Sequence, residues 1–305
     1  MANWSGIYPI LYAFWDQNGG LDEAAMRLQV EHCIASGAHG IAVLGLVTEV
    51  HKMDVNERLH LVEMVGSLIA KRVPYAVTLG EPSLEGQIAF SKAAVKAGAD
   101  WVILQPPPIK GTSQADLISF FGKVSEAVDV DVAVQNNPVN LDVSLSTEGL
   151  VALNRAHPNI SILKGEGFSI DIARAIEGSG GAYQVFGGHG GIEFPALLRS
   201  GGAGLIPAPD FLAAQVAFFE LWQAGHHADA EAIHRQILPA IVFMSRSVPA
   251  MLCYGKRLFA AQIGIDQLHD RAPALQPTAF GLAEIGRLGD DIAKASAPMS
   301  AKAAE

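Results

Sequence analysis

Three polar side chains interrupt apolar stretches of this sequence at places where they could do chemistry. Lys164 and Glu166 follow the mostly apolar run 160–163, and Gln135 ends the run 130–134. Burial disfavours the ammonium form of a lysine and so favours the free amine, which is the form that attacks a carbonyl carbon. Glu166 would project to the same side as Lys164 if extended backbone geometry continues, and there it could carry protons or pair with the lysine. The pattern predicts a lysine nucleophile with a carboxylate beside it.

Each of these side chains also has a plain structural interpretation. Lys164 could extend outward at a strand end with its charge in water, and Glu166 could be a solvated loop carboxylate. Gln135 could merely end its strand. His189, within the segment Gly-Gly-His-Gly-Gly, could line a pocket or lie exposed on the surface. The other histidines show no ligand-like spacing apart from one adjacent pair in a polar turn, so the sequence predicts no metal site.

Eight short apolar runs are available to position these residues. Their hydrophobicity is continuous rather than alternating, which is typical of strands buried on both faces in a parallel sheet. Amphipathic stretches typical of helices lie between the first runs, at 21–37, 53–72 and 83–100. The predicted strands are 6–14, 40–45, 74–79, 100–105, 130–135, 160–165, 182–187 and 203–208.

Eight strand–helix units in a row predict an α/β fold, a (β/α)₈ barrel over residues 1–208. A doubly wound open sheet is the alternative, but no Gly-rich dinucleotide-binding loop follows any strand. Residues 209–290 carry no strand pattern and predict the last barrel helix and a C-terminal three-helix appendage, while 291–305 are expected to be a flexible tail. In such a barrel the active site lies at the carboxyl ends of the strands, where the three polar side chains above are placed.

Composition narrows the classes of function. Half of the 305 residues are hydrophobic, and 21 Lys and Arg against 31 Asp and Glu give a net charge of −10. An acidic chain gives no support for binding nucleic acid or an anionic membrane. No signal peptide or membrane helix is apparent, so we expect a cytoplasmic protein. Cys33 and Cys253 show neither disulfide nor metal spacing and are expected to be buried as small hydrophobic side chains.

Five segments together resemble the dihydrodipicolinate synthase / N-acetylneuraminate lyase family. They are Gly-Leu-Val-Thr-Glu (45–49), the Asn-Pro turn at 137–138, the lysine within 160–165, Gly-Ala-Gly-Leu-Ile-Pro-Ala (202–208) and Gly-Lys-Arg-Leu-Phe-Ala-Ala-Gln-Ile-Gly (255–264). The resemblance implies a (β/α)₈ barrel with a three-helix appendage, assembled as a dimer or tetramer. It also implies lyase chemistry on a 2-oxo acid, with Lys164 as the Schiff-base lysine and no separate cofactor.

The chain departs from the family pattern at three places. The family usually has two hydroxyl residues after strand 2, whereas this chain has Leu46 and Val47 followed by Thr48, so a substrate carboxylate would meet backbone N–H groups or the Thr48 hydroxyl. No arginine follows the Asn-Pro turn, which argues against dihydrodipicolinate synthase itself. The strand-5 tyrosine that carries protons in the family is Gln135 here, and a carboxamide does not exchange protons usefully near pH 7. The branch that includes 2-keto-3-deoxy-L-arabonate dehydratase shares this glutamine and the Lys-x-Glu pattern.

Together these features favour a dehydratase of a 2-oxo-3-deoxy sugar acid. Lys164 would be the nucleophile and Glu166 the proton carrier, while Gln135 would hold a substrate hydroxyl or a water. A retro-aldolase that releases pyruvate and a non-catalytic barrel that binds a 2-oxo acid are the alternatives. Tyr12 is either a reserve hydroxyl or a core aromatic. The predicted substrate-binding residues are Leu46, Val47, Thr48, Gly188, His189, Ile206 and Tyr12.

Overall fold

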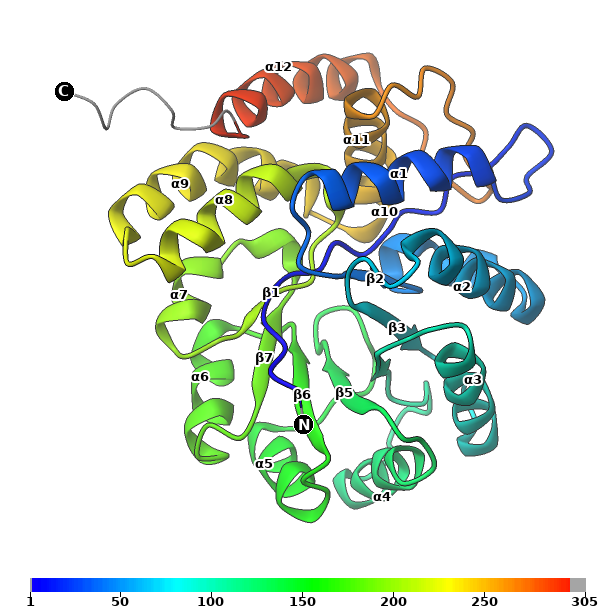
Figure 1. Cartoon of the computed structure of the whole chain (residues 1–305), viewed down its shortest axis with the longest axis vertical. Helices are drawn as coiled ribbons and strands as arrows, with labels where there is room; N and C mark the ends of the chain where they lie inside the picture. The colour runs from blue at the N-terminus through cyan, green and yellow to red at the C-terminus, as the bar shows by residue number, and fades with distance from the viewer. Residues whose placement is uncertain (1, 297–305) are drawn as a thin grey trace.

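The computed structural model describes residues 2–296, and its centre is an eight-stranded parallel sheet that closes on itself (Figure 1). The strand order is β1-β8-β7-β6-β5-β4-β3-β2, so each strand pairs with its neighbours in the chain. This order confirms the predicted barrel, because a doubly wound sheet would reverse its order part-way. The strands are β1 (Gly6–Ile7), β2 (Ile41–Val43), β3 (Tyr75–Leu79), β4 (Trp101–Leu104), β5 (Asp131–Asn136), β6 (Ile160–Gly165), β7 (Gln184–Gly187) and β8 (Gly204–Leu205).

The barrel closes at the first strand, which is shorter than the predicted run 6–14. Regular pairing with β8 covers only β1 itself. Pro9 faces β2, where it can only accept a hydrogen bond, because it has no N–H group. Beyond β1 the chain bonds to both neighbours. Ile10 N donates to Pro207 O on the β8 side at 2.7 Å, and Pro9 O accepts from Ala42 N on the β2 side at 3.0 Å. These bonds join the two edges of the sheet.

Helices follow the strands and surround the barrel (Figure 1). Five of the eight barrel helices start at a residue whose side chain caps the first turn; for example, Ser83 accepts from Gly86 N, and Asp54 forms a capping box with Glu57. Local chemistry therefore fixes the start of these five helices, whereas the other three begin without a side-chain cap. The barrel helices are α1 (Glu23–Ala35), α2 (Val55–Ile69), α3 (Leu84–Lys96), α4 (Gln114–Ser125), α5 (Thr147–Ala156), α6 (Ser169–Gly178), α7 (Phe194–Arg199) and α8 (Leu212–Gln223), with 3₁₀ turns η1 (Leu46–Thr48), η2 (Val50–Lys52), η3 (His189–Gly191) and η4 (Pro209–Phe211).

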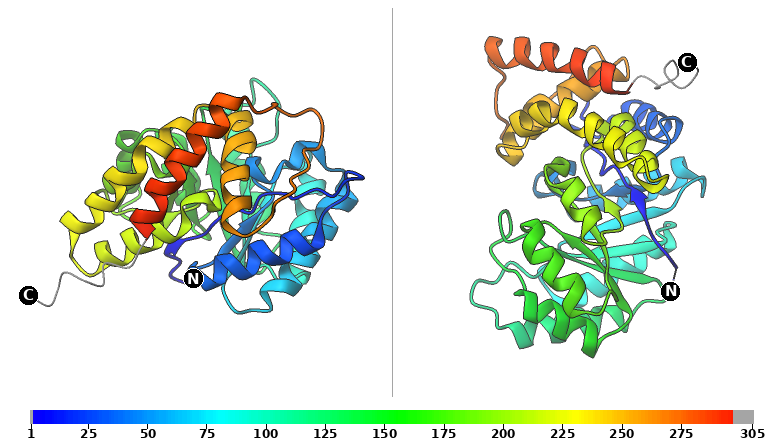
Figure 2. Two further views of the ribbon diagram at one scale, coloured as in Figure 1. Left: turned by 90° about the horizontal axis from the view of Figure 1, so that it is seen from above. Right: turned by 90° about the vertical axis from the view of Figure 1, so that its left-hand side faces the viewer.

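The C-terminal helices gather at one end of the molecule, where α9 packs on α8 and α12 packs on α9 (Figures 1 and 2). The predicted flexible tail from 291 is wrong for residues 291–296, which continue α12 as a regular helix; the rest of that tail lies outside the described residues. The elements are α9 (His227–Met244), α10 (Val248–Ala250), the π-helical turn η5 (Met251–Gly255), α11 (Lys256–Gln262) and α12 (Ala279–Ser296).

Within residues 2–296 no helix alone has the length and apolarity to cross a membrane. Together, α9 and residues 248–262 have the required length and apolarity, but the two segments are bent by 107° relative to each other.

Aromatic side chains fill part of the barrel interior. Tyr8, Trp101 and Phe186 are almost fully buried, and their ring centroids lie 5.3 to 5.6 Å apart. Phe186 on β7 is also the register partner of Lys164 on β6. The barrel interior therefore offers an apolar surface next to Lys164. Cys33 and Cys253 are both buried, as predicted.

The barrel seam generates a stability prediction. A Cβ atom at Gly204 would lie 2.0 Å from Gly6 O and 2.7 Å from Gly6 N, so β1 and β8 can pair only if this position is glycine. We expect Gly204→Ala to lower the free energy of unfolding by more than about 3 kcal/mol, because backbone atoms cannot move aside cheaply. Urea denaturation followed by circular dichroism measures the change.

The matched control is Gly286→Ala in α12, where an added Cβ meets open space. That change should stabilise the protein slightly, by up to about 1 kcal/mol, because alanine favours the helix. Equal effects of the two substitutions would contradict the tight approach at the seam.

Candidate active site

Lys164 is buried at the carboxyl end of β6, and its whole residue is only 4% exposed. Its register partners are Gln135 on β5 and Phe186 on β7, so an amide and an aromatic ring flank it. Lys164 does not extend into solvent at the rim. The fold has removed most water from this amine, as attack on a carbonyl requires.

The Glu166 carboxylate lies beside the amine and shares its burial, with 8% of the residue exposed. Its Oε2 atom is 3.5 Å from Lys164 Nζ and accepts hydrogen bonds from Gln135 Nε2 and, at 3.0 Å, from Asn137 Nδ2. Its Oε1 atom has no hydrogen-bond partner among residues 2–296. The two oxygens are therefore unequal: donors converge on Oε2, and Oε1 is free to receive a proton.

Gly188 makes room for this carboxylate. A Cβ atom at Gly188 would lie 2.2 Å from Glu166 Oε1 and 2.4 Å from its Cγ. The backbone of Glu166 is fixed as well, since its N–H donates to Asn136 O at 2.9 Å beyond the end of β6. Gly188, which was predicted to bind substrate, lines the larger cavity described below and also leaves space for Glu166.

The loop after β5 carries two polar residues, Asn137 and Asn140, that were not among the predicted site residues. Asn137 binds Glu166, and its Oδ1 accepts from Asn140 N at 3.0 Å. Asn140 Nδ2 lies 3.4 Å from His189 Nε2 and so connects this loop to the loop after β7. The signal was present in the sequence, because Asn137 directly follows the strand that ends in Gln135.

A small cavity of about 60 Å³ lies beside Lys164. Four of the predicted binding residues, Leu46, Val47, His189 and Ile206, line it. Val248 and Met251 reach it from the C-terminal appendage, at and just before the π-helical turn, and no sequence pattern pointed to them. The remaining lining residues are Ile10, Asn137, Asn140, Lys164, Glu166, Gly190, Pro207 and Ala208.

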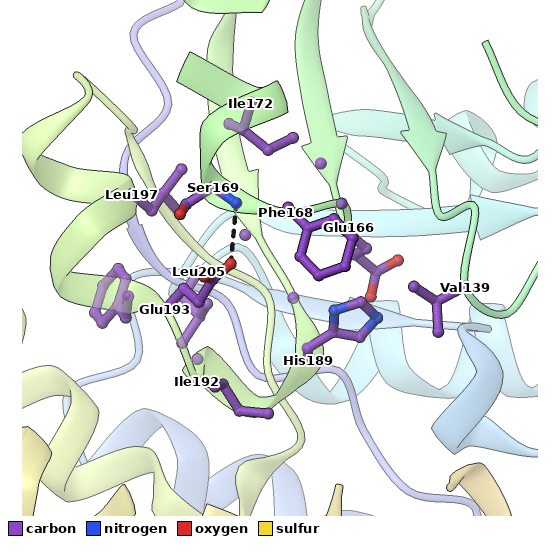
Figure 3. A pocket seen from close by; sticks show the side chains of 16 residues that line it. Val139, Glu166, Phe168, Ser169, Ile172, His189, Ile192, Glu193, Leu197 and Leu205 are labelled. Carbon is purple, nitrogen blue, oxygen red and sulfur yellow. Dashed lines mark hydrogen bonds between the residues drawn. The ribbon is translucent and has the colours of Figure 1, made fainter. Parts of the chain in front are cut away.

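A larger cavity of about 280 Å³ adjoins the small one and shares Glu166 and His189 with it (Figure 3). His189 has a left-handed backbone, with φ of 51°, in a loop otherwise rich in glycine. At the mouth lies Phe168, which is 73% exposed. Most other side chains of this cavity are apolar, namely Val139, Ile172, Ile192, Phe194, Leu197 and Leu205.

Thr48 does not line either cavity, contrary to the prediction. Its hydroxyl is fully buried and donates to Leu11 O at 2.7 Å, and its N–H donates to Gly45 O at 3.0 Å. Both polar groups serve to fold the 3₁₀ turn η1. Only the N–H groups of Leu46 and Val47, at the start of that turn, remain for a substrate carboxylate.

Of the two interpretations of Tyr12, the structure supports the core aromatic, because the side chain is fully buried and lines neither cavity. Its hydroxyl donates to Asp210 Oδ1 at 3.1 Å, and both residues are buried. Burial, with the charge of Asp210 beside it, raises the pKa of Tyr12 well above its ordinary value. Burial also raises the pKa of Asp210 to about 6, although its hydrogen bonds oppose this.

A buried cluster of one carboxylate and two lysines adjoins the turn η1, which lines the small cavity. Glu49 follows the turn η1 with a left-handed φ of 60°, and its carboxylate lies 2.7 Å from Lys256 Nζ and 2.5 Å from Lys52 Nζ. Burial alone would raise the pKa of Glu49, but the two lysines hold it below its ordinary value. Burial lowers the pKa of Lys256, and Glu49 opposes part of that change. Among residues 2–296 no group of His, Cys, Asp or Glu is arranged to hold a metal ion.

The family model described as the dihydrodipicolinate synthetase family matches residues 3–276. A protein from Azospirillum brasilense named L-2-keto-3-deoxyarabonate dehydratase is 28% identical over 242 residues, which are 77% of this chain and 78% of that protein. A protein from Emericella nidulans named "Probable 4-hydroxy-2-oxoglutarate aldolase, mitochondrial" is 30% identical over 241 residues, 75% of this chain and 76% of that protein.

Solved structures show the same fold. The 4-hydroxy-tetrahydrodipicolinate synthase of Methylacidiphilum fumariolicum SolV superposes with a TM-score of 0.86 at 21% identity, covering 96% of this chain and 97% of its own. At this identity the likeness establishes the barrel and its appendage and leaves the substrate open.

The Tyr12–Asp210 pair generates a pH prediction. Because the pKa of Asp210 is raised from 3.8 to about 6 on folding, the folded protein binds the proton more tightly. The resulting stability is fully present below about pH 4 and is lost as the pH rises through 6. Asp210→Asn removes this contribution, so the stability difference between wild type and variant should change by about 2 kcal/mol between pH 4.5 and 7.5. Urea denaturation at several pH values measures it.

The control is Asp116→Asn, at an exposed position in the first turn of α4. Its difference from wild type should stay nearly constant over the same range. A constant difference for Asp210→Asn as well would show that Asp210 is ionised in the folded protein throughout.

Proposed function

The chain belongs to the dihydrodipicolinate synthetase family, and from that premise we propose that it is a lyase that binds a 2-oxo acid as a Schiff base on Lys164. The observation that carries the proposal is the buried pair of Lys164 Nζ and the Glu166 carboxylate, 3.5 Å apart and next to a cavity. A desolvated amine is the nucleophile that a ketone requires. A carboxylate beside it is placed to move protons.

The reaction we propose is the dehydration of a 2-oxo-3-deoxy sugar acid. Lys164 Nζ attacks the C2 ketone, and loss of water leaves an iminium ion that acidifies the C3 protons. Glu166 Oε1 accepts one C3 proton to give an enamine. The enamine expels the C4 hydroxyl, which takes a proton from Glu166 and leaves as water. The product of this step is an iminium ion conjugated to a C3–C4 double bond. For a pentonate, loss of a C5 proton and protonation at C3 then give a C4–C5 enol, which becomes the C5 aldehyde by protonation at C4 and loss of the hydroxyl proton. Hydrolysis of the iminium ion frees Lys164 and 2,5-dioxopentanoate.

The remaining groups hold the substrate in this scheme. The N–H groups of Leu46 and Val47 bind the C1 carboxylate, because they begin a turn and lack partners within it. His189 and the larger cavity receive the part of the substrate beyond C4, since the small cavity has room only for the reacting end. No separate cofactor takes part, because the covalent bond to Lys164 supplies the electron sink.

Gln135 is the reason to rank dehydration above carbon–carbon cleavage. An aldolase must take the proton from the C4 hydroxyl as the C3–C4 bond breaks, whereas a carboxamide can only donate and accept hydrogen bonds. The Gln135 side chain already donates a hydrogen bond from Nε2 to Glu166 Oε2. The similarity to the dehydratase of Azospirillum brasilense supports the same choice.

Retro-aldol cleavage is the second candidate, and the similarity to the Emericella nidulans protein named as a probable aldolase favours it. Pyruvate would then be a product. An assay coupled to lactate dehydrogenase detects pyruvate, and mass spectrometry detects the loss of one water, so the two reactions can be told apart on one substrate.

We also propose that the chain forms a dimer or tetramer, as the family resemblance implies. Two apolar residues at the start of α6, Phe168 and Ile170, are 73% and 68% exposed. Such side chains gain stability when a second copy covers them.

The nucleophile is tested by trapping. Incubation of the wild type with pyruvate and sodium borohydride should yield a covalent adduct, and Lys164→Ala should abolish it, because the amine is gone. Intact-protein mass spectrometry measures the adduct. Lys123→Ala, on the exposed face of α4, should trap like the wild type. An adduct that persists in Lys164→Ala would overturn the assignment, and no adduct in the wild type would favour a barrel that only binds its ligand.

The proton carrier is tested by Glu166→Gln. The new amide can still meet Asn137 through its oxygen, but it cannot take a proton, so kcat for dehydration should fall by about 10²- to 10⁴-fold. Trapping of pyruvate should be retained, because the lysine is untouched. Glu63→Gln, an exposed carboxylate on α2, should leave kcat unchanged. Wild-type kcat in Glu166→Gln would show that another group carries the proton.

A further inference from the structure

A chain of buried amides leads from α3 through the barrel wall to Glu166. Gln87 Nε2, on α3, donates to Gln105 O at 2.8 Å. Gln105 Nε2 donates to Gln135 Oε1 at 2.9 Å, and Gln135 Nε2 donates to Glu166 Oε2. Gln105 follows β4, and neither Gln105 nor Gln135 lines the cavity beside Lys164.

The direction of this chain follows from its end. An ionised carboxylate only accepts hydrogen bonds, so Gln135 must turn its Nε2 toward Glu166 and its Oε1 away. That oxygen is buried and needs a donor, which Gln105 supplies. If Gln135 were turned over, its oxygen would face Glu166, and this arrangement is favourable only when the glutamate carries a proton.

We propose that Gln105 is a positioning residue that holds Gln135 in the orientation that keeps Glu166 ionised. The proposal rests on the proposed function for its catalytic meaning, since an ionised Glu166 is the form that can accept the C3 proton. Gln105 does not carry a proton itself, and it sets which oxygen of Glu166 is free to carry one.

The other titratable groups that face Glu166 are the same in every variant below. Lys164 lies beside it on β6, His189 shares both cavities with it, and Glu193 lines the larger cavity, where it accepts from Ser169 N. A change in the titration of Glu166 on substitution of Gln105 therefore reports on the amide chain.

The informative variant is Gln105→Met, which keeps the length of the side chain and removes its donor. The pH at which Glu166 is half protonated is measured without substrate, by infrared difference spectroscopy of the carboxylate band with Glu166→Gln as the reference. We expect this pH to rise by at least one unit in Gln105→Met, because Gln135 is then free to turn over. At neutral pH kcat should fall about tenfold, with borohydride trapping of pyruvate unchanged.

Gln105→Leu provides the second variant, and its effect should be similar, because it also removes the donor to Gln135 Oε1 and adds no charge. It also carries the test if Gln105→Met fails to fold. Gln17→Met, at an exposed position outside both cavities, should titrate like the wild type. An unchanged half-protonation pH in the Gln105 variants would overturn the proposal. This titration uses no substrate, so it decides the role of Gln105 independently of turnover. If the wild type turned over no 2-oxo acid, only the proposed function would be contradicted.

Discussion

Burial of the Glu166 carboxylate beside Lys164 is the interaction on which the rest of the site depends. A carboxylate removed from water without partners costs several kcal/mol, so the fold must supply donors to it. They come from three directions: Lys164 near the end of β6, Gln135 on β5 and Asn137 in the loop after β5. All three bind one oxygen, and Gly188 provides the space for the other. The need to stabilise one charge thus fixes the arrangement of three neighbouring segments.

The scaffold around this pair includes a strained turn that a buried ion pair stabilises. The turn η1, which lines the small cavity, ends at Glu49 in a left-handed conformation that a non-glycine residue adopts at some cost. The ion pair of Glu49 with Lys256 ties this turn to α11, directly after the π-helical turn that brings Met251 to the cavity. The appendage is therefore a wall of the site as well as a support for the barrel.

The sequence predicted the barrel, its eight strands and the lysine–carboxylate pair, because each leaves a local signal. Continuous apolar runs mark buried parallel strands, and the spacing of Lys164 and Glu166 places both on one side of a strand. Local pattern failed for Tyr12 and Thr48, whose hydroxyls are bonded to Asp210 and Leu11 O. A hydroxyl near a site looks the same in sequence whether it faces the substrate or completes a buried hydrogen bond.

By itself, then, the sequence determined the succession of strands and helices and the side-by-side placement of Lys164 and Glu166, since periodicity along each segment indicates the first and the spacing of the two residues indicates the second. The tertiary structure alone decided that Gln135 and Asn137 bind Glu166, that Gln105 stands behind them, and that Met251 reaches the cavity. These contacts join residues far apart in the chain. Their geometry depends on how the strands close into a barrel and how the helices pack against it. A local pattern of residues does not encode contacts between segments that are far apart in the chain.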